Sequence, residues 1–196
     1  MRMIIQLVAV GYVLVSIFEN PSPWISLGIV SVMMCIAAWI AIRPIRHQPG
    51  FLIPALIALS TSVSIHLVIC LALVLKADSW YQPQLLIPIA GMFFANTMNG
   101  ISLAAERYQS ELNNQIPPDQ ARINAFHAAM IPQINGLLAV GVVALPGMMT
   151  GQILSGVSPL VAVRYQIMIM TMILGTSGLG AAIMLWLVSR RQIKTT

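Results

Sequence analysis

The amino-acid sequence predicts an all-α, polytopic integral membrane protein with about six transmembrane helices. Of its 196 residues, 58% are hydrophobic and only 8% are charged, whereas a soluble domain carries about 25% charged residues. Uncharged runs recur along the chain, each near the roughly 20 residues that a helix needs to cross a bilayer. So few charges cannot cover a water-facing surface, which argues against a soluble enzyme, a nucleic-acid-binding domain or a disordered chain.

Six apolar segments are expected to cross the membrane, at residues 3–18, 21–42, 51–75, 85–105, 128–145 and 165–189. No small-residue cleavage pattern follows the first of them, so it is interpreted as a span rather than a signal peptide. A tight turn is predicted at residues 19–23. Residues 146–159 are too apolar for an exposed loop and too rich in Gly and Pro for a straight helix. A broken, possibly re-entrant segment is therefore predicted before the last span.

The positive charges predict the orientation of the chain. With six spans, one side of the membrane holds eight of the ten Lys and Arg residues, namely Arg2, Arg43, Arg46, Arg107, Arg122, Arg190, Arg191 and Lys194. The other side holds Lys76 and Arg164. Because cytoplasmic segments carry the excess of Lys and Arg, both termini are expected in the cytoplasm, with the protein in the inner (plasma) membrane.

Residues 106–127 form the largest polar segment and are predicted to be cytoplasmic. A helix is expected to leave the membrane and end near Asn114, with a turn at Pro117-Pro118 and a short helix re-entering over residues 121–129. Two interpretations stay open, a solvated loop and a docking surface for a cytoplasmic partner. In the second, the residues predicted to contact the partner are Arg107, Glu111, Asp119 and Arg122.

Sequence signatures of catalysis and of nucleotide binding are absent from the chain. It has no phosphate-binding G-x-x-x-x-G-K-[ST] loop, no H-E-x-x-H, no paired-cysteine zinc pattern and no G-x-S-x-G elbow. We therefore expect a protein that is not an enzyme and binds no cofactor itself. His66 and Cys70 share one face of the third span and could hold a metal, although a histidine bonded to a backbone carbonyl is commoner.

Polar and sulfur-containing side chains within the spans have two interpretations each. The amides and hydroxyls in the fourth span and beyond could join helices or line a translocation path. The thirteen methionines could fill gaps in the packing or act as soft metal ligands. If a metal does pass, the candidate path residues are Asn96, Asn99, Met148, Met149 and Gln152; no resident metal site is predicted.

Several stretches resemble the membrane subunits of the Fet-type (FetB-like) iron-export ABC transporters, a group that includes plant aluminium-tolerance permeases. The resemblance is carried by I-P-I-A-G-M at residues 87–92, N-T-M-N-G-I-S-L-A at 96–104, and L-P-G-M-M-T-G at 145–151. It continues through G-V-S-P at 156–159 and R-Y-Q-I at 164–167. It implies a single permease domain over residues 1–196 that exports iron or another metal ion. It further implies two copies of this chain and a separate cytoplasmic ATPase subunit that binds ATP and Mg²⁺ and pushes on residues 106–127.

The chain departs from that family at two places. Family members usually carry one more apolar helix before the region that matches Met1, and a longer cytoplasmic stretch with an L-G-A-T-P-x-E-A-like element. Here residues 115–121, Q-I-P-P-D-Q-A, replace that element in a shortened form. The alternative function is therefore a stand-alone channel or membrane scaffold that has lost its coupling to an ATPase; an intramembrane enzyme ranks last.

Overall fold

The computed structural model describes residues 2–19, 21–45, 50–77 and 79–193. All the secondary-structure elements within these ranges are helices, which confirms the predicted all-α fold class. The elements in chain order are α1 (Arg2–Glu19), α2 (Pro23–Ala41), η1 (Arg43–Ile45), α3 (Leu52–Val68), η2 (Ile69–Val74), α4 (Pro83–Asn113), α5 (Pro118–Ala139), α6 (Gly147–Leu154) and α7 (Pro159–Ile193). Here η1 is a 3₁₀ turn and η2 is a π-helix.

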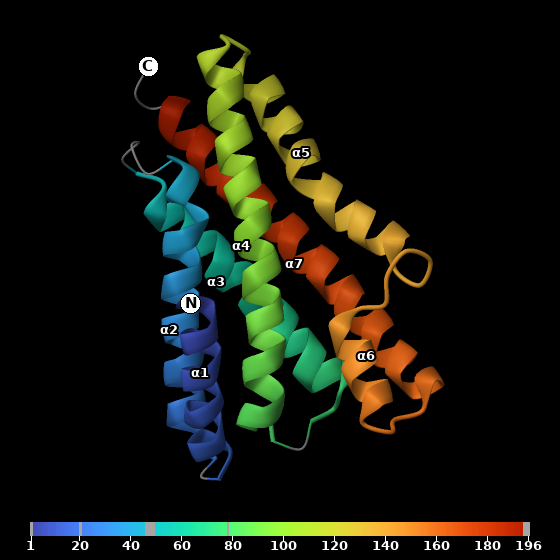
Figure 1. Ribbon diagram of the computed structural model, residues 1–196. Coiled ribbons are helices and arrows are strands. Elements are labelled where there is room, and N and C mark those ends of the chain that lie inside the picture. Colours follow the sequence, from blue (N-terminus) through green and yellow to red (C-terminus); the bar gives the residue numbers. More distant parts are fainter. Residues whose placement is uncertain (1, 20, 46–49, 78, 194–196) are drawn as a thin grey trace.

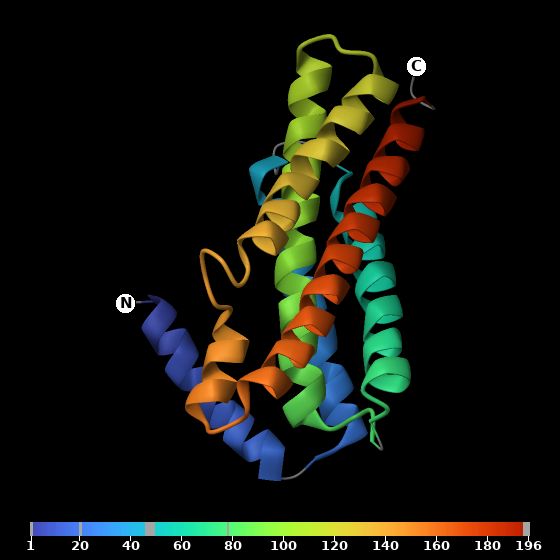
Figure 2. The same ribbon diagram turned by 90° about the vertical axis from the view of Figure 1, so that its right-hand side faces the viewer.

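The long helix α4 lies at the centre of the bundle and packs against α7, α5 and α2 (Figures 1 and 2). The helix α3 packs chiefly against α7. The first helix, α1, lies at the edge of the bundle, and its described side chains are exposed or half-buried. Apolar side chains such as Tyr12 and Leu7 therefore face outward from α1, which suits a helix surrounded by lipid.

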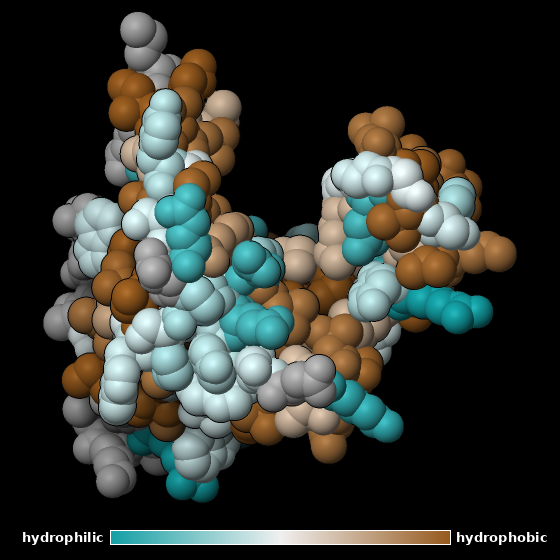
Figure 3. Space-filling model, turned by 90° about the horizontal axis from the view of Figure 1, so that it is seen from below, coloured by the Kyte–Doolittle hydropathy of each residue, from teal (hydrophilic) through white to brown (hydrophobic). Residues whose placement is uncertain are grey.

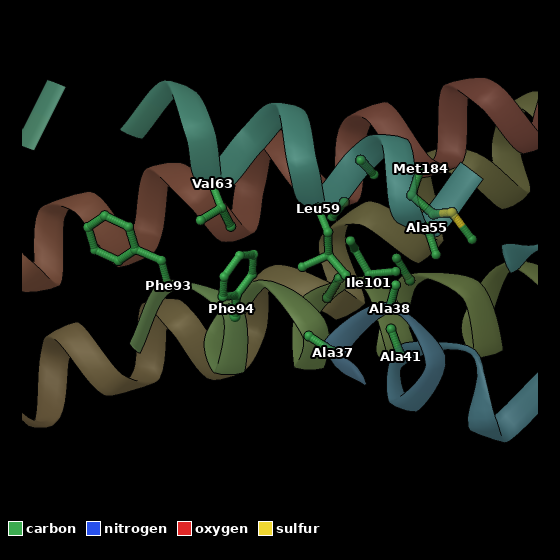
Figure 4. Packing of buried hydrophobic residues seen from close by; sticks show 14 of the residues in the cluster. Ala37, Ala38, Ala41, Ala55, Leu59, Val63, Phe93, Phe94, Ile101 and Met184 are labelled. Atoms are coloured by element: carbon green, nitrogen blue, oxygen red, sulfur yellow. The ribbon is translucent and has the colours of Figure 1, made fainter. Parts of the chain in front are cut away.

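The core is made of small residues between the helices and large residues in the spaces that remain. Ala37, Ala38 and Ala41 of α2 are buried against the bundle, and Ala121, Ala125 and Ala129 recur at four-residue spacing on α5. Small side chains let helices approach closely, which is how helices associate inside a membrane. Figure 4 shows Leu59, Val63, Phe93, Phe94 and Ile101 interlocking between α3 and α4.

Four helices are long and apolar enough to cross a membrane by length and composition, with α1 as a shorter apolar helix. They are Pro23–Ala41, Leu52–Val74, Pro83–Asn113 and Pro159–Arg190. The protein is therefore a polytopic membrane protein, as predicted, although the described residues contain four such helices and one shorter apolar helix rather than the six predicted spans.

The predicted fifth span at residues 128–145 needs a correction. The helix α5 starts earlier, at Pro118, and already ends at Ala139. The chain then turns through residues 140–146, where Gly141 adopts a φ of +81°, a conformation that suits glycine and ends the helix. The broken segment predicted after it is present as the short helix α6, with Gly156 at a φ of +88° beyond its end.

The charged segments separate between the two ends of the bundle. One end carries η1, the turn between α4 and α5, and the last turns of α7, so that Arg43, Arg107, Arg122 and Arg190 belong to it (Figure 1). We call it the hairpin end. Lys76 follows η2, and Arg164 lies near the start of α7, so both belong to the opposite end. The helices thus group these six basic residues as the charge distribution predicts, while Arg46 and Lys194 of the predicted set lie outside the described residues.

Candidate functional site

A cavity of about 550 Å³ lies between α4, α6 and α7, toward the end opposite the hairpin; we call it the α4–α6 cavity. Figure 3 views the molecule from that end and shows a hydrophobic surface hollowed between two projecting parts. The cavity is lined by Leu75, Gln84, Leu85, Pro88, Ile89, Met92, Met148, Gln152, Val157, Tyr165, Met168 and Ile169. Its size and its mostly apolar lining with a few polar groups are typical of small-molecule sites.

One face of α4 forms a wall of this cavity. Gln84, Pro88 and Met92 all line it, and they follow one another at the four-residue spacing that places side chains on one helix face. Pro88 has no N–H, so it cannot donate to the carbonyl of Gln84 one turn earlier. Asn96 continues the same face; its Nδ2 donates to the carbonyl of Met92 at 2.8 Å. This face of α4 therefore carries two amide side chains, those of Gln84 and Asn96, among apolar ones.

The helix α6 forms the facing wall. Met148 and Gln152, one turn apart, both line the α4–α6 cavity. The Oε1 atom of Gln152 is buried and has no hydrogen-bond partner among the described residues. A buried amide oxygen without a partner is costly, so this atom is open to a donor on a water or a ligand in the cavity.

The predicted path residues are only partly brought together. Met148 and Gln152 line the α4–α6 cavity, and Asn96 lies one turn beyond it. Met149 instead lines a second cavity, of about 340 Å³ between α5, α6 and α7. Asn99 lies on an exposed position of α4.

Several residues that line the α4–α6 cavity were not among the predicted path residues. Gln84, Met92 and Tyr165 all line it. The four-residue spacing of residues 84, 88, 92 and 96 was the signal that could have found the first two. No comparable signal marks Tyr165, because its position depends on how α7 crosses α4.

His66 acts as a packing residue in this structure. Its Nδ1 lies 2.9 Å from the carbonyl oxygen of Ser62, one turn earlier in α3. Among the described residues, no group of three or more His, Cys, Asp or Glu side chains could hold a metal ion. The geometry therefore favours the second of the two interpretations of His66, a histidine bonded to a backbone carbonyl.

The hairpin of α4 and α5 is held by a chain of polar contacts. Glu111, on the last turns of α4, is buried and forms an ion pair with Arg107. Asn124 of α5 donates from Nδ2 to Oε2 of Glu111 at 3.0 Å, and Gln120 donates to Asn124 Oδ1 at 2.9 Å. Because a buried carboxylate needs such partners, this network fixes α5 against α4.

The tip of the hairpin is exposed and well defined. As predicted, α4 ends at Asn113, and the chain reverses through Gln115, whose φ is +62°. Pro118 then starts α5, with Asp119 in its first turn, where a negative charge favours the helix dipole. Asp119 and Arg122 form a loose pair, with Oδ1 and Nη2 at 3.5 Å. Of the four residues predicted to contact a partner, Glu111 braces the hairpin, whereas Asp119 is free to face outward.

Comparison with known proteins places the chain among membrane proteins. The uncharacterised protein family UPF0014 matches residues 1–123 and 118–193. A UPF0014 membrane protein of Synechocystis is 39% identical over 91% of this chain and 75% of its own length. The probable iron export permease protein FetB of Escherichia coli is 33% identical over 97% of this chain and 78% of its own.

A plant protein also matches. Protein ALUMINUM SENSITIVE 3 of Arabidopsis thaliana is 31% identical over 90% of this chain and 69% of its own length. No solved structure matches the chain.

Proposed function

The chain belongs to the UPF0014 family of membrane proteins, and from this we propose that it is the membrane-spanning permease subunit of an ABC transporter. Its cargo in this proposal is iron or another metal ion, moved out of the cell. The observation that carries the proposal is the 33% identity to a probable iron export permease over 97% of the chain. ATP and Mg²⁺ would be bound by a separate cytoplasmic ATPase subunit, so this chain would catalyse no reaction itself.

The α4–α6 cavity supports a transport role. It is a half-open space between the helices, and its amide and thioether groups are neutral donors that could contact a passing ion or small molecule. Gln152 and Met148 of α6 and Met92 of α4 are the residues that we propose to contact the cargo. Asn96 would extend this path toward the middle of α4.

The hairpin supports an ATPase partner. Its exposed tip projects from the bundle, and the network around Glu111 makes it a stiff lever rather than a loose loop. A push on Asp119 at the tip would therefore be passed along α4 to the cavity wall, since both belong to one continuous helical hairpin. In this proposal Arg107 and Glu111 hold the lever and Asp119 lies at the contact, whereas Arg122, which lines a groove between α5 and α7, lies outside it.

The short helix α6 supports the expected homodimer. None of its residues is buried, and a side chain added at Gly147 or Gly151 would meet open space. Two glycines four residues apart on an uncovered helix permit close approach of another helix in the membrane. We propose that a second copy of this chain covers this face.

Co-purification tests the proposed function. The tagged full chain is expressed with the ATPase encoded beside it, solubilised in mild detergent and purified through the tag. A stoichiometric ATPase subunit, whose ATP hydrolysis rises in the presence of this chain, is the expected result. Loss of that association in the Asp119→Lys variant, with the chain still folded, would place the contact at the hairpin.

The same experiment addresses the alternative function. A pure, folded preparation without any ATPase, from cells that contain the ATPase, would contradict the permease proposal. It would instead favour a stand-alone channel or scaffold. Ion flux through vesicles containing this chain alone, without ATP, would then separate the channel from the scaffold.

A further inference from the structure

A second apolar groove, outside the proposed transport path, lies between α5 and α7 at the hairpin end. It has a volume of about 370 Å³, and its floor includes Phe126 of α5 and Leu185 of α7. Figure 2 shows the two helices running side by side toward that end. Ile123 and Trp186, which also line the groove, are each nearly half exposed, so the groove opens onto the outer face of the bundle.

An arginine and a histidine lie along the groove. Arg122 and His127 both line it. The guanidinium of Arg190 lies over the ring of Trp186, 4.0 Å from its centroid, which holds this second arginine at the groove edge. Trp186 thus lines the groove and also holds the guanidinium of Arg190 against its ring.

The nearby carboxylates leave this positive charge largely uncompensated. Asp119 contacts Arg122, but at 3.5 Å and with its side chain 88% exposed, so the pair is weak. Glu111 is occupied by Arg107 and Asn124 on the α4 side of the hairpin. Among the described residues the groove therefore combines an apolar floor with cationic groups at its rim.

This combination matches one class of membrane component. Tryptophan and arginine at the end of a spanning helix lie at the level of the lipid headgroups. Basic pockets between helices at that level bind acidic headgroups, and the apolar floor accepts the acyl chain. We propose that the groove is a binding site for an acidic phospholipid, with its phosphate at Arg122 and Arg190 and an acyl chain along Phe126 and Leu185.

Native mass spectrometry of the purified full chain tests this proposal. The protein is presented with equal amounts of phosphatidylglycerol and phosphatidylcholine, and the retained lipid is measured. We expect phosphatidylglycerol to be retained roughly tenfold more than phosphatidylcholine. The R122Q/R190Q double variant should reduce that preference to less than twofold.

Two further variants separate a site from a general basic surface. Ala182→Trp fills the groove while every charge remains, and it should also abolish the retained lipid, because Ala182 lines the groove. Arg43→Gln removes an exposed positive charge at the same end but outside the groove, and it should leave retention unchanged. Thermal unfolding of each variant in phosphatidylcholine checks that the fold is intact.

Five outcomes would overturn the proposal. Equal retention of both lipids, or an Ala182→Trp variant that keeps the preference, would show that the groove is not the site. If Arg43→Gln also lost the preference for phosphatidylglycerol, the preference would come from the net charge of the protein and not from the groove. If glycerol phosphate displaced phosphatidylglycerol as well as free lipid does, the two arginines would bind a free phosphate and not a lipid. Crosslinking of Ile123→Cys to an ATPase subunit would assign the groove to a protein partner.

Discussion

The imidazole of His66 in α3 lies directly against the backbone of Gly175 in α7. A Cβ placed on Gly175 would overlap the Nε2 of His66 and approach its Cδ2 to 3.0 Å. Beside this contact, the Oγ of Ser62 donates to the carbonyl of Thr176 at 2.5 Å. The close approach of α3 and α7 therefore depends on the absence of a side chain at Gly175, on the ring of His66 and on the hydroxyl of Ser62.

Gly175→Ala is expected to destabilise the protein by about 1–3 kcal/mol, because the added methyl group overpacks this crossing. Thermal unfolding in detergent measures the loss. Gly178→Ala, in the same helix, is the matched control, since its Cβ would make only ordinary contacts of 3.5 Å with Met130. The double variant His66→Ala/Gly175→Ala should lose less than the two single losses combined. Equal melting of the Gly175 and Gly178 variants would contradict this account.

Gly141→Ala is expected to cost about 1 kcal/mol for a purely conformational reason. Its φ of +81° is strained for alanine, although nothing lies within 4 Å of the added Cβ. Gly136→Ala provides the comparison, because it also faces open space but lies inside α5. That substitution should be neutral or stabilising by about 0.5–1 kcal/mol. If both variants melt alike, the turn after α5 does not need glycine.

Glu111→Ala is expected to destabilise the hairpin by about 1–3 kcal/mol, since it leaves Asn124 and Arg107 without their shared acceptor. Asp119→Ala removes an exposed carboxylate from the same hairpin and should cost less than about 1 kcal/mol. Hydrogen exchange of the α5 amides reports the difference locally. Equal protection of α5 in the two variants would mean that Glu111 does not brace it.

Met148→Trp is expected to reduce transport at least tenfold, because the larger ring fills the α4–α6 cavity. Iron content of cells that express the ATPase and either variant is the measurement. Leu7→Trp places the same ring on α1, at an outward-facing position that is 63% exposed, and it should transport normally. Normal export by the Met148 variant would place the path elsewhere.

Single cysteines at Lys76 and Gln115 should react from opposite sides of the membrane. Both positions are exposed, and they belong to opposite ends of the bundle. In a chain whose Cys35 and Cys70 are replaced by serine, a membrane-impermeant maleimide added to intact cells should label Lys76→Cys and spare Gln115→Cys. The reverse pattern would invert the proposed orientation.

The helices were predictable where apolar length and proline decide the outcome. Pro23 and Pro83 start helices near the predicted edges, and α4 ends at Asn113 as expected. The end of α5 could not be predicted, because residues 128–145 form one apolar run in the sequence. The turn is visible only in the backbone, where Gly141 has a positive φ. For the candidate site, residue type suggested Gln152 and Met148, but which side of α6 faces α4 depends on tertiary packing. Met149, its sequence neighbour, faces another cavity for that reason.

The helix α6 lies between two left-handed glycines, Gly141 and Gly156, and buries none of its own side chains. One wall of the α4–α6 cavity is thus joined to the rest of the bundle by glycine turns on both sides and by half-buried side chains such as Met148, with no fully buried residue of its own. Resizing that space then needs only rotation about a few backbone bonds, while α2, α3, α4 and α7 keep their mutual packing. In the proposed transport role, a push on this wall would turn α6 about its two glycines and leave the packing of the other helices intact.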